Sequence, residues 1–238
     1  MRYVSFGYSD IGQVRERNED CFLVDDEHLV YAVADGLGGL PEGQLASRLA
    51  IRTLADALLE IRAGAKADYG AIVQRINQQV YRKGLEVSDS MGIGTTLTAL
   101  FIFGDCFEIY HVGDCAAFLL HNGKFEQLTA EHTMAAELRS QPNFAKGSVL
   151  PEYLSHTLTR CIGQRDHVDA QVIHGKISPG DRLLLCSDGI TKVIDSDVLF
   201  KELAKARAPE RYVRRIIDRA NEEGGPDNAT AITLFADE

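Results

Sequence analysis

The segment VADGLGGLPEG, residues 33–43, joins a strand-like run to a helix-like run. Before it, HLVYAVA (28–34) is apolar. After it, GQLASRLAIRTLADALLEI (43–61) has the apolar spacing of a helix. An Asp-Gly pair between apolar runs normally marks a tight hairpin turn, but no second strand follows Asp35 and Gly36. The acid and the glycine therefore stand at this strand end for another reason.

The rest of the chain groups strands and helices into blocks. Apolar runs rich in β-branched and aromatic residues predict strands at 3–8, 21–26, 28–34, 96–104, 106–112, 115–121, 169–175, 181–187 and 229–236. Apolar spacing and capping residues predict helices at 43–62, 70–86, 195–206 and 209–220, and a short helix near 132–139. This order lacks the strand–helix alternation of a parallel sheet. We therefore expect one α+β domain over residues 1–238, with antiparallel sheets and helices packed outside them.

Composition narrows the class of protein. The chain has 238 residues, 45% of them hydrophobic, and a formal net charge of −10. An acidic protein is a poor partner for nucleic-acid phosphates, so no nucleic-acid partner is expected. The five cysteines include no Cys-x-x-Cys pair and predict small buried thiols in a reducing compartment. The N-terminus has no apolar signal core and no apolar run approaches ~20 residues, so we expect a cytoplasmic protein without a membrane partner.

Acidic residues recur at the ends of the predicted strands. Five positions share this place: Glu19-Asp20, Asp35, Asp114, Asp188 and Asp227. One such acid alone is most simply a turn residue. If the sheets bring all of them to one rim, their repulsion must raise their pKa values or be neutralised by cations. Ligand sets made only of oxygen suit Mg²⁺ or Mn²⁺, and the scattered histidines offer no zinc site.

Gly36 and Arg15 add to this chemistry. The run GLGGLP (36–41) is not a dinucleotide loop, because Pro41 stands where that pattern needs glycine. Gly36 instead lets the backbone come close to another group, such as a metal that draws on its carbonyl. Arg15 is either a counter-ion of the acids or a clamp for a phosphate. Two hard metals beside an anion clamp indicate phosphoryl hydrolysis.

Seven segments, in this order, resemble the metal-dependent serine/threonine protein phosphatases of the type 2C family, and most closely their bacterial single-domain branch. They are SDIGQVRERNED (9–20), VADGLGG (33–39), GTTLTAL (94–100), HVGDCAAFLL (111–120), LTRCIG (158–163), LLLCSDGI (183–190) and GGPDNAT (224–230). The resemblance covers the chain from about residue 5 to residue 235. It implies a central β-sandwich of two antiparallel sheets with a helix pair on each outer face, which agrees with the layering expected above.

The resemblance assigns a first metal to the N-terminal acids. Asp35 matches the catalytic aspartate that bridges two metals. Gly36 matches the glycine whose carbonyl joins one of these metals. Glu19 and Asp20 match the acidic pair on that same metal, which they reach mostly through water.

The resemblance assigns further ions and the substrate clamp to the remaining residues. Asp188 and Asp227 match the ligands of the other tightly bound metal. Asp114 matches the ligand of a third, weaker metal, which it shares with Asp188. Arg15 matches the catalytic arginine that binds the phosphate of the substrate.

Leu37 departs from one branch of the family. Animal members carry a histidine directly after the Asp-Gly pair, proposed as the general acid, whereas bacterial members commonly do not. Leu37 cannot donate a proton, so the expected donor to the leaving group is a water bound to a metal. Residues 131–165 match the variable flap beside the active site, which we expect to be specific to the partners of this protein.

The function implied is hydrolysis of phosphoserine and phosphothreonine in proteins, by attack of a metal-bridging water at a dinuclear Mn²⁺ or Mg²⁺ centre. The expected partners are phosphorylated proteins, themselves substrates of a serine/threonine kinase, and the expected state is a monomer. One alternative is a non-catalytic phosphoprotein sensor on the same fold. The absence of metal ligands from the sequence would indicate such a sensor. Another is a two-metal phosphodiesterase or nuclease, which the net charge of −10 disfavours.

Overall fold

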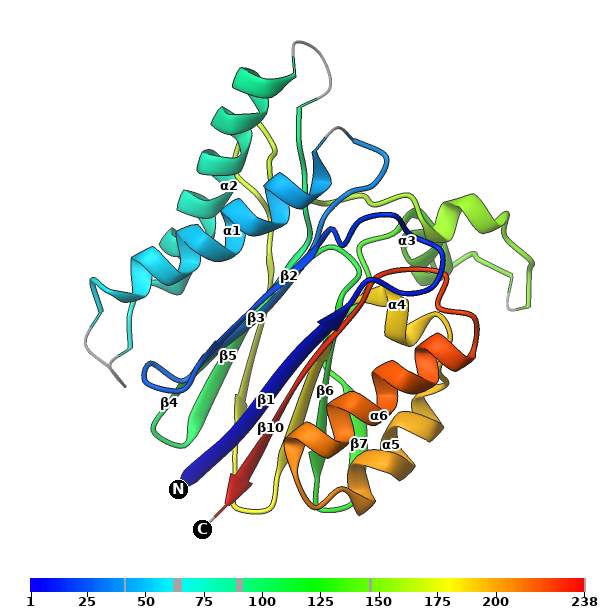
Figure 1. Cartoon of the computed structure of the whole chain (residues 1–238). Helices are drawn as coiled ribbons and strands as arrows, with labels where there is room; N and C mark the ends of the chain where they lie inside the picture. Colours follow the sequence, from blue (N-terminus) through cyan, green and yellow to red (C-terminus); the bar gives the residue numbers. More distant parts are fainter. Residues whose placement is uncertain (41, 62–65, 89–91, 146, 238) are drawn as a thin grey trace.

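The computed structural model, which describes residues 1–40, 42–61, 66–88, 92–145 and 147–237, contains two five-stranded antiparallel sheets. One sheet has the strand order β1-β10-β9-β6-β7 and the other β2-β3-β4-β5-β8. Their bounds are β1 Arg2–Asp10, β2 Asp20–Asp25, β3 Val30–Asp35, β4 Leu97–Phe103, β5 Cys106–Val112, β6 Ala116–His121, β7 Lys124–Gln127, β8 Gln171–Lys176, β9 Arg182–Cys186 and β10 Ala229–Asp237. Figure 1 shows β1 and β10 side by side along their whole length.

The two sheets pack face to face, and their facing side chains form the central core of the sandwich. In β9, Leu183 and Leu185 belong to this central layer, whereas Leu184 belongs to the layer beneath the helices. Successive side chains of a strand point to opposite faces, so β9 is buried on both sides and is apolar without interruption. Ile232 of β10 pairs with Leu185 across the sheet and joins the same central layer.

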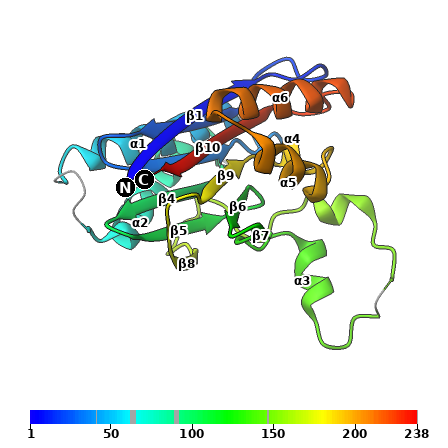
Figure 2. The same cartoon turned by 90° about the horizontal axis from the view of Figure 1, so that it is seen from below.

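A pair of helices covers the outer face of each sheet (Figures 1 and 2). Helices α1 (Gly43–Leu58) and α2 (Tyr69–Val87) cover the β2-to-β8 sheet, and α5 (Ser196–Lys205) and α6 (Pro209–Glu222) cover the other sheet. The apolar stripes predicted from the sequence face the sheets, since Leu54 and Leu58 of α1 are buried against strand residues. The predicted α+β sandwich with helix pairs on both outer faces is confirmed.

The shortest elements were the hardest to predict from the sequence. The hairpin at Asn122-Gly123 is present between β6 and β7, and the φ angles of 49° and 78° match a turn that needs two left-handed residues. The predicted short helix is also present, as α3 (Met134–Ser140). Helix α4 (Asp188–Thr191) and the 3₁₀ turn η1 (Glu152–Ser155) were not predicted, because one turn is too short to show an apolar period.

The cysteines and the membrane-spanning potential of the helices were both predicted from composition. The five cysteines form no disulfide, but only Cys115 and Cys186 are buried as expected, while Cys21, Cys106 and Cys161 are half-buried. Among the described helices, none combines the length and the apolar character needed to cross a membrane.

Replacing Ile232 by alanine tests the central core. Ile232 is fully buried between the sheets. The Ile232→Ala substitution should lower the free energy of unfolding by about 2–5 kcal/mol, because it leaves a cavity that the sheets cannot close. Denaturant titration measures this as a lower midpoint at an unchanged slope. Val149→Ala is the control, since the Val149 side chain is 94% exposed and its loss should change stability by less than about 0.5 kcal/mol.

Candidate active site

Strand pairing brings the predicted acids to one end of the sandwich. Asp20 and Asp35 are directly paired across β2 and β3. Cys186, two residues before Asp188, pairs with Ala116 of β6 on one side and with Ala231 of β10 on the other. The loops that carry Asp114, Asp188 and Asp227 therefore meet at the same rim. They line one open pocket together with Arg15, Glu19, Asp35, Gly36, Thr96, His156, Lys192 and Asn228.

Three carboxylates of this pocket lie close together. Asp35, Asp114 and Asp188 each offer an oxygen, and these oxygens all lie within 4.8 Å of one another. Burial and the neighbouring acids, Asp20 foremost, hold the pKa of Asp35 well above its usual range. Burial, with a further contribution from Asp188, raises the pKa of Asp114 to about 7, although the nearby Lys192 acts in the opposite direction. Carboxylates in this condition favour binding of a proton or a cation.

Two glycines explain the Asp-Gly pattern by close backbone contact. A Cβ atom on Gly36 would lie 2.3 Å from the carbonyl oxygen of Gly43 at the start of α1. A Cβ atom on Gly189 would lie 2.0 Å from the carbonyl oxygen of Asn228. Neither glycine has a positive φ, so the requirement at both sites is space rather than an unusual backbone angle. Each glycine lets another segment of the site pack directly against the turn that carries the preceding acid.

The oxygen atoms of the site fit a hard divalent cation. Asp20 Oδ2 accepts hydrogen bonds from Ser187 Oγ (2.7 Å) and Thr230 Oγ1 (2.6 Å), which fix the orientation of the carboxylate. The other oxygen, Asp20 Oδ1, is buried and has no hydrogen-bond partner among the described residues, and the same holds for Asp188 Oδ1. Buried polar atoms rarely stay unpaired. Unpaired carboxylate oxygens beside a cluster of further oxygens are what Mg²⁺ or Mn²⁺ requires.

Arg15 lies at the edge of this cluster. Its Nη2 donates a hydrogen bond to Asp227 Oδ2 at 2.8 Å. The side chain keeps 47% of its surface exposed, so part of the guanidinium still faces the open pocket. The hydrogen bond that Arg15 donates to Asp227 is the main cause of the raised pKa of Arg15, and the charges of Asp35 and Glu19 add to it. Arg15 is thus both a counter-ion of the acids and available to an anionic ligand.

Asn228 joins segments of the site that are far apart in the sequence. Its Oδ1 accepts from the backbone N–H of Glu19 at 2.8 Å, and its Nδ2 donates to the carbonyls of Ile11 and Arg17. The loop that carries Arg15 is therefore attached to the loop that carries Asp227. Sequence reasoning did not identify Asn228, because nothing in its local sequence points to partners more than 200 residues away.

Lys192 is a second residue that sequence reasoning missed. It follows α4, and its Nζ donates a hydrogen bond to Asp188 Oδ2, while His156 Nδ1 lies 3.0 Å from the same nitrogen. Burial lowers the pKa of Lys192, but Asp188, Asp114 and Asp227 more than offset this, so the pKa is raised. The spacing of four residues between Asp188 and Lys192 is the signal that could have revealed the pair.

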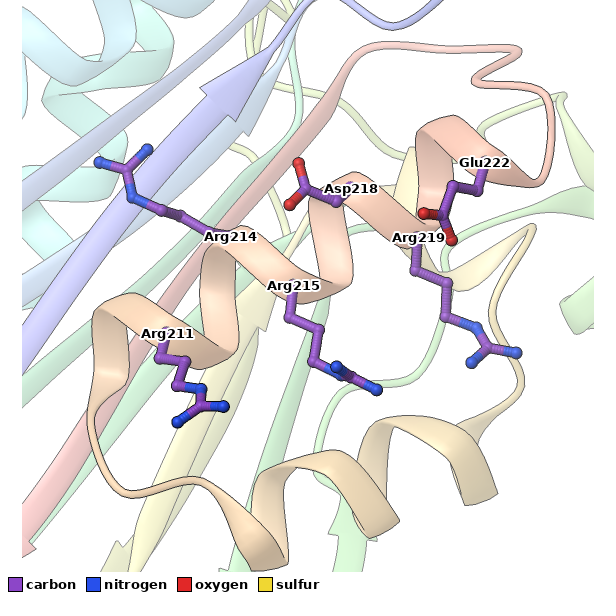
Figure 3. A pocket seen from close by; sticks show the side chains of 6 residues that line it. All are labelled: Arg211, Arg214, Arg215, Asp218, Arg219 and Glu222. Carbon is purple, nitrogen blue, oxygen red and sulfur yellow. The ribbon is translucent and has the colours of Figure 1, made fainter.

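A second hollow, on α6, has a different character (Figure 3). Three of its four arginines pair with acids: Arg214 with Glu210, Arg215 with Glu202 and Arg219 with Glu223. Arg214 points toward β1, where its guanidinium also lies over the rings of Phe6 and Tyr8. This surface is an ion-paired helix face, so the acid-lined pocket is the candidate active site.

Comparison with known proteins agrees with this geometry. A family model described as "Protein phosphatase 2C" matches residues 7–232. The chain belongs to the protein phosphatase 2C family. The serine/threonine phosphatase Stp of Listeria monocytogenes is 30% identical over 237 residues, which cover 96% of this chain and 94% of that protein.

Solved phosphatase structures share the fold. The structure of the Mycobacterium tuberculosis serine/threonine phosphatase PstP/Ppp has a TM-score of 0.86 at 29% identity, over 99% of both chains. The catalytic domain of the phosphatase PstP, in complex with two manganese ions, has a TM-score of 0.85 at 30% identity, again over 99% of both chains. The chain is therefore a metal-dependent serine/threonine protein phosphatase that uses divalent metal cofactors.

Replacing Asp35 by asparagine tests the electrostatics of the phosphatase site. A carboxyl whose pKa is raised by folding stabilises the protein below its unfolded pKa of about 4, and this stabilisation is lost as the pH rises through the folded pKa. Asparagine does not titrate. In EDTA, Asp35→Asn should therefore be more stable than wild type at about pH 7.5, and the difference should vanish toward about pH 4.

Thermal unfolding across this pH range measures the effect. Asp56→Asn, at an exposed position of α1, should show no such pH-dependent gain. The same Asp35→Asn protein should lose its stabilisation by added Mn²⁺. If Asp35→Asn is only as stable as wild type at both pH values, or still binds Mn²⁺ tightly, then the charge of Asp35 does not have the role described.

Proposed function

We propose that this phosphatase hydrolyses phosphoserine and phosphothreonine in proteins with two tightly bound Mn²⁺ or Mg²⁺ ions and a third, weaker one. The observation that carries the proposal is the cluster of Asp35, Asp114 and Asp188, whose oxygens lie within 4.8 Å of one another in a pocket that Arg15 also lines. When bound, the metal ions acidify a water and hold the phosphoryl oxygens. The manganese-bound relative supports the choice of metal.

The side chains divide between the ions as follows. Asp35 would help to hold both tight ions, and the carbonyl of Gly36 would join it at one of them. Glu19 and Asp20 would act on that same ion, mostly through water, and the hydrogen bonds from Ser187 and Thr230 keep Asp20 oriented. Asp188 and Asp227 would hold the second tight ion, and Asp114 together with Asp188 would hold the third. Asp20 Oδ1 and Asp188 Oδ1, which have no hydrogen-bond partner within the described part of the chain, support these assignments.

Arg15 holds the phosphate of the substrate. Its planar guanidinium can donate two parallel hydrogen bonds to phosphate oxygens, which a lysine cannot reproduce. The hydrogen bond to Asp227 keeps the guanidinium beside the acids before substrate arrives. Arg15 thereby links substrate position to the residues that hold the second ion.

The surroundings of the site support the choice of a protein substrate. The pocket is open, and His156, Thr157 and Leu158 of the expected flap, 131–165, form part of its wall. We propose that residues 1–238 act as one catalytic domain, as a monomer, in the cytoplasm of a bacterium. Its substrates are then proteins phosphorylated by a serine/threonine kinase, and its role is in signal transduction.

Two other functions remain distinguishable by experiment. A non-catalytic phosphoprotein sensor on this fold would have lost metal ligands, whereas every carboxylate ligand matched to the family is present in this sequence. A two-metal phosphodiesterase would cleave a bis-ester as well as a monoester. The acidic net charge of −10 argues against a nucleic-acid substrate.

Metal removal and a panel of phosphopeptides test the proposed function. EDTA should abolish phosphate release from phosphoserine and phosphothreonine peptides, and Mn²⁺ or Mg²⁺ should restore it, because the site offers oxygen ligands. Phosphotyrosine peptides and bis(p-nitrophenyl) phosphate are the comparison substrates. Restoration by Zn²⁺ alone would contradict the metal assignment, and binding of phosphopeptides without any turnover would favour the sensor.

Replacing Arg15 tests the phosphate clamp. Arg15→Ala should raise KM for phosphopeptides by about 10- to 100-fold, because charged hydrogen bonds made in the ground and transition states are lost together. Arg15→Lys should recover only part of the loss, since lysine cannot form the paired contact. Arg52→Ala, on the exposed face of α1, is the matched control. If Arg15→Ala has the kinetics of wild type, Arg15 does not bind the phosphate and is only a counter-ion of Asp227.

A further inference from the structure

Lys192 occupies an unusual place for a lysine. It lines the acid pocket, its side chain is only 32% exposed, and its Nζ donates to Asp188, whose side chain is only 10% exposed. The two oxygens of Asp188 therefore differ. Oδ2 accepts the hydrogen bond from the Lys192 ammonium, whereas the buried Oδ1 has no partner among the described residues. One carboxylate can thus face a metal with one oxygen and Lys192 with the other.

The ammonium also acts on Asp114. Lys192 and Asp114 line the same pocket, and an oxygen of Asp114 lies within 4.8 Å of one of Asp188, the acid to which Lys192 donates, so the positive charge is close to both carboxylates. Asp114 and Asp188 are the pair proposed above for the third ion. A fixed positive charge therefore lies where those two acids would jointly attract a divalent cation.

We propose that the Lys192 ammonium is a tethered competitor for the third cation at Asp114 and Asp188, and that it makes this chain bind the third ion weakly. The inference rests on the proposed two-plus-one metal site and adds what controls its occupancy. With little divalent metal present, Lys192 supplies the positive charge beside Asp188. At higher metal concentration, the third ion must bind against the repulsion of Lys192 or displace it.

Lys192 also contacts the flap, so displacing its ammonium would affect the flap as well as the metal site. His156, directly after η1, lies 3.0 Å from the Lys192 nitrogen through its Nδ1. When the third ion displaces the ammonium, this contact is broken. The third ion and the contact between Lys192 and His156 of the flap then exclude each other.

A plain helix-stabilising pair is the competing explanation. Lysine four residues after an aspartate commonly stabilises a helix slightly. Such a role predicts that loss of Lys192 lowers thermal stability and leaves metal binding unchanged. The third-site affinity, measured without substrate, distinguishes the two explanations.

Metal counting on purified protein is the test. Isothermal titration with Mn²⁺, checked by the electron paramagnetic resonance signal of free Mn²⁺, is performed on wild type, Lys192→Met and Lys192→Arg. Methionine keeps the length without the charge, and arginine keeps the charge. Lys192→Met should bind the third ion at least about tenfold more tightly, since a nearby like charge is removed, whereas Lys192→Arg should remain close to wild type.

Two further variants make the result specific. Lys205→Met, at an exposed position in the last turn of α5, is the matched control and should change nothing. Adding Asp114→Ala to Lys192→Met should remove the tightened ion and leave the two tight ions bound. If Lys192→Met does not fold, Lys192→Gln carries the same comparison, with circular dichroism as the check on folding.

The outcomes separate this inference from the proposed function. Unchanged third-site affinity in Lys192→Met, or equal tightening in Lys205→Met, overturns the role of Lys192. Absence of any tight Mn²⁺, or of phosphopeptide turnover by wild type with Mn²⁺, overturns the proposed function instead. Two tight ions, normal turnover and a tightened third ion in Lys192→Met support both.

Discussion

The carboxylates of Asp35, Asp114 and Asp188 repel one another from positions within 4.8 Å, and the two sheets hold them there. A buried, unpaired charge costs several kcal/mol, so an arrangement of this kind persists only with compensation. Some compensation is internal, since Lys192 and Arg15 each donate to one acid of the site. The remainder is left for bound cations, which makes affinity for divalent metals a direct consequence of how the strands pair.

The backbone around the acids is adapted to the same constraint. Gly36 and Gly189 have no Cβ, and the segments at Gly43 and Asn228 pack into the space that a side chain would fill. These contacts bring α1 and the loop before β10 against the two Asp-Gly turns. The acids therefore stand on backbone that neighbouring segments fix from both sides. Rigid positioning of this kind lets repelling groups stay close instead of turning away into solvent.

The sequence predicted the strands, the long helices and the acidic residues well, because each carries a local signal. Alternating or continuous apolar runs define β3 and β9, and the Asp-Gly pairs mark their ends. The residues that connect the site were not predictable in this way. Asn228 bonds to the backbone of Glu19 over a separation of 209 residues, and His156 meets Lys192 only in the folded chain. The metal roles themselves came from resemblance, since spacing alone left open whether Asp35 was a turn residue.

The pairing of β1 with β10 has a consequence for how the chain could be cut and rejoined. Arg2 lies opposite Asp237, so the two ends are neighbours, while Asp10 and Ala229 at the other end of the same pair lead into the pocket loops (Figure 1). A short peptide linking the ends would span little distance and stay clear of the acids. New ends could then be opened at the exposed hairpin tip of Gly123, between β6 and β7. We therefore expect the catalytic rim to tolerate circular permutation of the chain that builds it.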